Sequence, residues 1–256
     1  MKTTKNEGFV LTQFSSADRK AFKLIIELLS PLVELQTLGR YSTMSADEVW
    51  LTLVEQVSVM GSARPIERLA SDCGKYRKFK EAVSLSAVTS QPNPTTYVSQ
   101  TLKEFSATRF YRRAADKLVA ILGSPNVFKG GRFLLLEGLS HKDDATQTRN
   151  DLIRRCPIFH LKSASDFMIG VGLSHDVIAL DTRIIGIFRD HFGYNLTVNQ
   201  IQSNPKYYFS LEAALGEICH EESIPLALID RLLSNFSNLS IIELAVRRPG
   251  LIDRLR

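Results

Sequence analysis

One lysine and one aspartate have the types and the spacing that covalent chemistry needs. Lys162 stands near the start of a predicted helix, and Asp181 follows nineteen residues later, at the predicted start of the next helix. A desolvated lysine amine gives up its proton more readily and can act as a nucleophile. An ionised aspartate at a helix N-terminus can stabilise positive charge that develops at a sugar carbon as it loses its base. One amine and one carboxylate are therefore the minimal set for cleaving an N-glycosidic bond through a Schiff base.

The elements around these two residues form a predicted helical hairpin followed by a third helix. A tight turn at residues 156–160 separates two predicted helices, the second of which begins near Leu161. A helix of about ten residues spans roughly 15 Å. The apolar connection 177–180 can then fold back and bring Asp181 into the groove that Lys162 enters.

Apolar residues recur with helical periodicity along most of the chain, and strand patterns are few. A first helix is expected over residues 17–40, bent or split at Pro31, and a second begins at the capping box of Ser45 and Glu48. A short helix at 63–69 and a long one at 97–122 follow. Another helix ends near Arg155, and more are expected from residue 160 onward. Residues 84–96 are expected to form a loop, and residues 133–136 fit either a strand or a buried helical turn. The sequence therefore predicts an all-α protein.

The composition is that of a globular protein and excludes several classes. The chain has 256 residues, of which 44% are hydrophobic and 23% charged, and a net charge of +5 that favours a polyanionic partner only weakly. The apolar fraction excludes a disordered chain, and the lack of an 18-residue apolar run excludes a membrane span. The N-terminus lacks the hydrophobic region of a signal peptide, so we expect a cytoplasmic protein. Three scattered cysteines exclude a disulfide framework and a four-cysteine metal cluster.

Several stretches of the sequence resemble a known protein family. The sharpest are Lys162-Ser-Ala-Ser-Asp-Phe167, Gly170-Val-Gly172 and Ala179-Leu-Asp181. They are similar to the catalytic core of the helix-hairpin-helix (HhH-GPD) DNA glycosylases, above all to the compact prokaryotic 8-oxoguanine DNA glycosylase/AP lyases. Residues 53–63 resemble the family's helix with a Gln-x-Ser/Thr signature, here Gln56 and Ser58, whose following loop fills the space left by an extruded base. Residues 218–238 resemble the C-terminal helices of the compact branch.

The resemblance implies an all-α, two-lobed HhH-GPD fold with a DNA-binding cleft between the lobes. We expect residues 1–40 and 145–256 to form the lobe with the hairpin and the catalytic aspartate, and residues 41–144 to form the other. The implied Schiff-base residue is Lys162, and the implied catalytic carboxylate is Asp181. The implied partner is double-stranded DNA with a modified base, 8-oxoguanine by resemblance. The enzyme is expected to be monomeric and nucleoid-associated and to need no cofactor or metal.

The same resemblance implies residues that contact DNA and a side chain that stacks on the flipped base. The DNA-binding set is Gln56, Ser58, His160, Arg183, Lys78 and Arg112. Cations on the DNA face supply affinity that falls with salt, and further candidates are Lys75, Arg77, Lys80, Arg109 and Arg113. An extruded base needs an aromatic or apolar partner. The residues available to stack on it are Phe159, Tyr207, Tyr208 and Phe236, among which the sequence does not choose.

The sequence departs from the family pattern in three places. Ile158 and His160 occupy hairpin positions at which the family usually has glycines that let backbone N–H groups approach a DNA phosphate. Arg183 stands where the family often has a histidine, and Arg256 ends the chain in place of the lysine that helps to read 8-oxoguanine. Two alternatives therefore stay open. One is a glycosylase for a different modified base, and the other is a catalytically silent helix-hairpin-helix DNA-binding protein.

Overall fold

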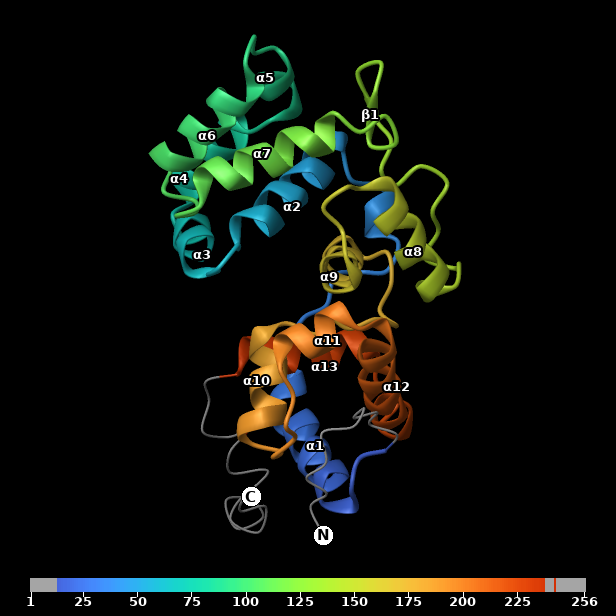
Figure 1. Cartoon of the computed structure of the whole chain (residues 1–256). Helices are drawn as coiled ribbons and strands as arrows, with labels where there is room; N and C mark the ends of the chain where they lie inside the picture. The colour runs from blue at the N-terminus through green and yellow to red at the C-terminus, as the bar shows by residue number, and fades with distance from the viewer. Residues whose placement is uncertain (1–12, 238–241, 243–256) are drawn as a thin grey trace. The chain divides into compact units, whose positions relative to one another are not determined.

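The computed structural model describes residues 13–237 and residue 242, and the fold is helical (Figure 1). The predicted role of Arg256 lies outside these residues. The chain divides into two compact units, one of residues 37–173 and one that combines the residues up to 36 with those from 174 onward. The described residues hold one β-hairpin, β1 (Phe128–Lys129) with β2 (Arg132–Phe133), and otherwise only helices and turns. None of the described helices is long and apolar enough to cross a membrane.

The unit of residues 37–173 is built around α2, which packs against both α7 and α9. Its helices are η2 (Arg40–Ser42), α2 (Ala46–Ser58), α3 (Arg64–Ser71), α4 (Cys73–Ala82), α5 (Leu85–Thr89), α6 (Pro94–Glu104), α7 (Tyr111–Leu122), α8 (Ala145–Arg155) and α9 (Leu161–Val171). Trp50 of α2 is buried in this core, and its Nε1 donates to the Val83 carbonyl at 2.7 Å, which satisfies the polar group of the ring. Helix α2 thus links the core of the unit to the helix that carries Lys162.

The other unit is built around α13, which packs against α1, α10 and α12. Its helices are α1 (Ser16–Leu29), η1 (Ser30–Leu32), α10 (Thr182–Asp190), α11 (Val198–Ser203), α12 (Pro205–Glu221) and α13 (Leu226–Asn235). The ring of Phe14, just before α1, lies 5.2 Å from the ring of Phe22 and 5.7 Å from that of Phe188. Such buried aromatic pairs add to the hydrophobic stabilisation. They hold α10, and with it Asp181 at its start, against α1.

Several predicted helix boundaries are confirmed. The Ser45 hydroxyl accepts the Glu48 N–H at 3.2 Å, and the Glu48 carboxylate accepts the Ser45 N–H at 2.7 Å, so α2 begins at the predicted capping box. Pro31 lies in η1, directly after the end of α1, as a proline within a helical pattern predicts. Helix α8 ends at Arg155.

Three local predictions are wrong. The helix expected over residues 17–40 ends with η1 at Leu32, and residues 33–39 are not helical. Residues 84–96 are not a loop but contain α5 and the start of α6, where the Asn93 side chain accepts a backbone N–H at 3.0 Å and Pro94 fits the first turn. Residues 97–122 do not form one helix. Ser106 has a φ of 55°, a left-handed conformation, and lies in the turn that separates α6 from α7. Ser, Asn and Pro serve both loops and helix caps, so composition alone does not separate the two.

The ambiguous stretch 133–136 follows a tight hairpin. Gly130 and Gly131 have φ values of 58° and 77°, and the two-residue turns that join antiparallel strands require positive φ at both central positions. Phe133 ends β2, and the remaining residues of the stretch belong neither to a strand nor to a helix. Of the two alternatives left open for this stretch, a strand is present, but it covers only Phe133 of these four residues.

The boundary between the two units differs from the predicted one. Residues 145–173 were expected in the lobe that contains Asp181, and they belong instead with residues 37–144. The reason is packing, since α8 lies against α9 and α9 lies against α2. The apolar face of α9, which includes Phe167, is buried within that unit.

The three cysteines differ in burial, which gives a direct test of the packing. Cys156 and Cys219 are buried, whereas Cys73 is exposed. Burial raises the pKa of the Cys156 thiol to about 11 and that of Cys219 to about 12, and the thiolate is the reactive form. We expect iodoacetamide at pH 8 to modify one cysteine in the native protein and all three after unfolding, as counted by mass spectrometry. Modification of Cys156 or Cys219 as fast as Cys73 would contradict this packing.

Candidate active site

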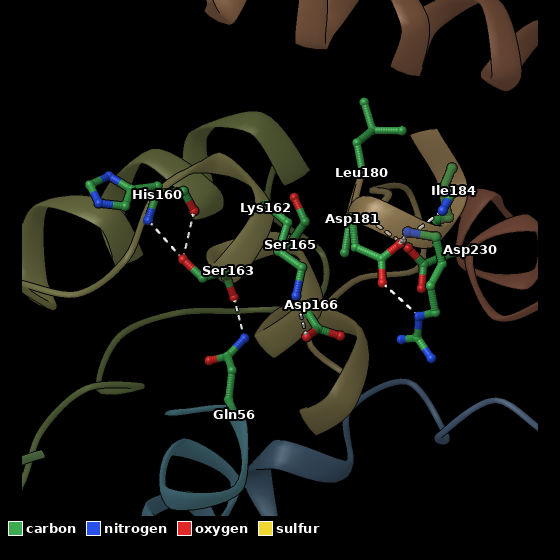
Figure 2. A network of polar contacts seen from close by, with 12 residues as sticks. Gln56, His160, Lys162, Ser163, Ser165, Asp166, Leu180, Asp181, Ile184 and Asp230 are labelled. Atoms are coloured by element: carbon green, nitrogen blue, oxygen red, sulfur yellow. Dashed lines mark hydrogen bonds and ion pairs between the residues drawn. The ribbon is translucent and has the colours of Figure 1, made fainter. Parts of the chain in front are cut away.

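Helix α9 presents Lys162 on its first turn (Figure 2). The Ser163 hydroxyl closes the start of the helix, because it accepts the His160 N–H at 2.8 Å and donates to the His160 carbonyl at 3.2 Å. Gly172 ends the helix with a φ of 68°, and a Cβ there would lie 2.2 Å from the Thr37 carbonyl oxygen. Only glycine fits that position. The helix is thus held at both ends by contacts within its own unit.

The amine of Lys162 faces a carboxylate on the same helix. Its Nζ lies 3.2 Å from Asp166 Oδ2, and the two side chains are 26% and 25% exposed. Residues four apart lie on one helix face, so the sequence contained the signal for Asp166, which the motif reasoning missed. The amine is partly exposed, and an acceptor for its proton is within reach.

A second residue that the sequence reasoning missed is Arg149 of α8, whose side chain is buried. Its Nη1 donates to the Ser165 hydroxyl at 3.0 Å, and that hydroxyl donates to the Leu161 carbonyl at 2.8 Å. A buried guanidinium is retained only with hydrogen-bond acceptors, because an unpaired charge is costly to desolvate. This chain of bonds ties α8 to the residue directly before Lys162.

Gln56 lies on the last turns of α2 and contacts the start of α9. Its Nε2 donates to the Ser163 carbonyl at 2.7 Å, while its Oε1 is buried and has no hydrogen-bond partner among the residues that the structure describes. The observed contact therefore positions the helix turn that carries Lys162. The contact between Gln56 and DNA stays a prediction.

The prediction that Ser58 contacts DNA does not fit its position. The side chain is 0% exposed, and its hydroxyl donates to the Val54 carbonyl at 2.7 Å. Serine in a helix often bonds the carbonyl four residues back, and here it does so on the buried face of α2. The motif match did not indicate the side of the helix on which Ser58 lies.

Asp181 lies in the other unit, where it is the N-cap of α10. Its Oδ1 accepts the N–H groups of Arg183 and Ile184, both at 2.9 Å, and its Oδ2 accepts from the Arg183 Nε at 2.9 Å. The side chain is 15% exposed, and these three bonds fix the orientation of the carboxylate. Arg183, predicted to bind a DNA phosphate, is engaged with Asp181 instead and remains exposed.

The extended segment before Asp181, residues 177–180, is held by side chains of α11, α12 and α13, among them Glu212 of α12, which accepts the Ile178 N–H at 3.2 Å. Further contacts are Asp230 Oδ1 with the Ala179 N–H at 2.6 Å, the Tyr208 hydroxyl with the Ile178 carbonyl at 2.5 Å, and Gln202 Nε2 with the Leu180 carbonyl at 2.9 Å. Asp230 is 1% exposed and also lies 3.2 Å from the Arg231 guanidinium. Buried backbone groups must be paired, and these side chains pair those of residues 178–180. This clamp of Asp230, Tyr208 and Gln202 therefore determines the position of Asp181.

The clamp predicts a specific loss of stability. Asp230→Ala removes the acceptor of the buried Ala179 N–H, and we expect the free energy of unfolding to fall by about 1–3 kcal/mol. Asp230→Asn keeps an acceptor oxygen at the same place and is expected to lose less. Urea unfolding of the three proteins measures the difference. An Asp230→Ala protein as stable as the wild type would contradict the clamp.

The other predicted DNA-contacting residues lie on the surface of the unit of residues 37–173. His160, Lys78 and Arg112 are exposed, the first directly before α9 and the others on α4 and α7. The remaining basic candidates are also exposed, namely Lys75, Arg77, Lys80, Arg109 and Arg113. Their positions are compatible with a solvated face and with DNA binding alike.

Two of the four residues considered for stacking on a flipped base are buried. The ring of Phe159 packs 5.2 Å from the ring of Phe167, and Tyr208 belongs to the clamp of Asp230, Tyr208 and Gln202. Tyr207 and Phe236 are half-buried and keep exposed ring surface. An aromatic ring in a helical pattern more often packs in the core than binds a ligand, which explains the two failures.

The structure gathers Gln56, His160 and Ser163 near Lys162 in one unit, and Arg183 near Asp181 in the other. Within residues 13–237 and 242, no group of three or more His, Cys, Asp and Glu side chains could hold a metal ion. The chemistry that this set offers is that of an amine, two carboxylates and hydrogen-bond donors.

A comparison with protein-family models and one with curated proteins gave no match. Solved structures do match. The crystal structure of the Methanocaldococcus jannaschii 8-oxoguanine glycosylase/lyase in complex with a 15mer DNA containing 8-oxoguanine has a TM-score of 0.55 at 19% identity, over 92% of each chain. That of the 8-oxoguanine DNA glycosylase from the same organism has a TM-score of 0.60 at 18% identity, over 85% of this chain and 93% of that one. The protein therefore has the all-α HhH-GPD fold of these glycosylases, as its sequence predicted.

Proposed function

We propose that the protein is a DNA glycosylase with AP lyase activity that excises a damaged or modified base. The observation that carries this proposal is the partly exposed amine of Lys162 on the first turn of α9, next to a carboxylate, in a protein with the HhH-GPD fold. Both similar solved structures are of 8-oxoguanine glycosylases, one of them bound to DNA with that lesion. By this likeness we propose 8-oxoguanine in duplex DNA as the substrate. We further propose that the protein acts on nucleoid DNA as a monomer.

The reaction begins with extrusion of the damaged nucleotide, because a base inside a duplex cannot be reached. Exposed cations such as Lys78 and Arg112 supply affinity for the phosphates. The hairpin has Ile158 and His160 where close backbone approach would favour glycine. We therefore propose that the exposed His160 ring contributes to the phosphate contact.

Lys162 then attacks the anomeric carbon C1′. A bond forms between Nζ and C1′, the bond from C1′ to the base breaks, and the base leaves with the bonding electrons and takes up a proton. Asp181 stabilises the positive charge that develops at C1′ as the base departs. Ring opening gives an imine between Nζ and C1′, loss of a proton from C2′ expels the 3′ phosphate by β-elimination, and hydrolysis releases the lysine.

Asp166 has a place in the same scheme as the group that takes the lysine proton. An ammonium is not a nucleophile, so the amine must lose a proton before it attacks. The carboxylate 3.2 Å away accepts that proton without any rearrangement of the helix. Removing Asp166 is then expected to slow adduct formation without abolishing it.

The pairing of Lys162 with Asp166 also supports a second candidate, a DNA-binding protein without catalysis. An i,i+4 ion pair is an ordinary feature of a solvated helix face, and it holds the amine away from other partners. A third candidate, a glycosylase for another modified base, is supported by the altered hairpin at Ile158 and His160 and by Arg183.

Borohydride trapping on a panel of duplexes separates these candidates. Borohydride reduces the imine and leaves the protein covalently attached to DNA, which gel electrophoresis detects. We expect adducts with an abasic duplex and with an 8-oxoguanine duplex, and none with an undamaged one. Adducts with the abasic duplex and a different lesion would identify another base as the substrate. Binding without any adduct would leave only the DNA-binding candidate.

A further inference from the structure

A strongly basic pocket lies in the unit of residues 37–173, away from the residues around Lys162. It has a volume of about 780 Å³ and is formed by α3, the start of α4 and the turn between α6 and α7. Five basic side chains line it, namely Arg64, Arg68, Lys75, Lys103 and Arg109. A single carboxylate lines it, that of Asp72, which caps α4 by accepting the Lys75 N–H at 2.9 Å. The pocket therefore carries a large excess of positive charge.

These cations have no carboxylate partners within the described part of the chain. None of the five forms a salt bridge with a described residue. Two of them lie over aromatic rings instead, Lys103 at 5.9 Å from the centre of the Tyr111 ring and Arg109 at 4.8 Å from that of Phe110. Like charges gathered without counter-charges repel one another, and an anionic ligand relieves this repulsion.

The pocket lies beyond the C-terminal end of α2, the helix that contacts α9 through Gln56. Ser62, which lines the pocket, follows Gln56 by six residues, and Gln56 is bonded to the first turn of α9. Figure 1 shows α3 and α4 on the side of α2 that is turned away from α8. The phosphate backbone of a DNA strand bound near α9 could therefore extend along the end of α2 to the pocket.

We infer that this pocket binds a phosphodiester group of DNA, away from the nucleotide that reacts. The inference rests on the proposed function in taking DNA as the ligand. Arginine forks match the oxygens of a phosphate, and three arginines line the pocket. Tyr111 and Phe105 add aromatic surface of the kind that packs against sugars and bases. Cations drawn from several elements suit an extended polyanion.

The test compares two charge-reversal variants of the full chain on an undamaged duplex. Arg68→Glu/Lys103→Glu alters the pocket, and Lys129→Glu/Lys142→Glu makes the same change of charge at exposed residues of the same unit outside it. We expect the pocket variant to raise Kd at least about tenfold at 0.1 M salt and to lower the salt slope by about 1–2, the loss of one or two phosphate contacts. The control is expected to stay within about threefold of the wild type. Fluorescence anisotropy measures both.

Equal weakening by the two variants would overturn the inference, because it would reflect net charge alone. A second arm titrates sodium tripolyphosphate into the wild type and the pocket variant. Tight binding that the pocket variant abolishes, with DNA affinity unchanged, would assign the pocket to a small phosphate and also overturn the inference. Failure of the proposed function is distinguishable, since it appears as a lack of borohydride adducts while undamaged DNA is still bound.

Discussion

Lys162→Gln protein is expected to bind duplex DNA but to form no detectable covalent adduct with it in the presence of borohydride. The glutamine amide has nearly the length of the lysine side chain but no nucleophilic amine, so the imine cannot form. We expect adduct formation and strand cleavage to fall by at least about 10³-fold, the scale on which removal of a nucleophile acts. The loss should be as large on an abasic duplex as on a lesion duplex, because both routes pass through the same imine.

The matched control for this variant is Lys206→Gln. Lys206 is the second residue of α12 as Lys162 is the second residue of α9, and its side chain is exposed. This control removes one amine from the first turn of a helix and is expected to trap DNA like the wild type. Full adduct formation by Lys162→Gln would mean that a different amine reacts and would refute the assignment of Lys162.

Asp181→Asn is expected to bind DNA normally and to release the base about 10²–10³-fold more slowly at saturating DNA. The asparagine oxygen can still accept the N–H groups of Arg183 and Ile184, so the cap of α10 is retained. The substitution removes the negative charge. Loss of one electrostatic contact to a developing charge slows a reaction by about 10²–10³-fold. Single-turnover base release measures the effect. Adduct formation on an abasic duplex, where no base has to leave, should fall less.

Asp144→Asn is the matched control for this second variant. Asp144 is also a helix N-cap, and its Oδ1 accepts the Gln147 N–H at 2.7 Å at the start of α8. It removes the same charge from the same kind of position, so a general effect of capping or of net charge would appear in both proteins. Base release by Asp181→Asn at the wild-type rate would show that the reaction does not use this charge.

The contacts that the sequence predicted correctly involve residues close together in the chain. The capping box of Ser45 and Glu48 spans three residues, as does the contact of Asp181 with the Ile184 N–H. Such contacts depend on local geometry that residue type and spacing already specify. The pairing of Lys162 with Asp166 belongs to the same class. The i,i+4 spacing of these two residues predicts their contact, but the family motif does not include it.

The failures concern which side of an element faces the core. Ser58 and Gln56 belong to one helix two positions apart, yet the first is buried and the second contacts α9. Tyr208 has the size and polarity of a base-stacking residue, but its hydroxyl supports the segment before Asp181. Periodicity predicts that a helix has a buried face, but the neighbours that bury it come from distant parts of the chain.

Taken by itself, the sequence determined the helical class and the starts of several helices, α2 among them. It also predicted two residues with the chemistry for a Schiff-base reaction. The tertiary structure alone decided how those residues are held. Asp230 contacts Ala179 across 51 positions, and Gln56 contacts Ser163 across 107. Contacts at such separation form only when the helices pack, because packing buries polar groups that local structure leaves unpaired, and these groups must then find a hydrogen-bond partner. The basic pocket arose in the same way, since residues 64–75 and 103–109 meet only in the folded unit.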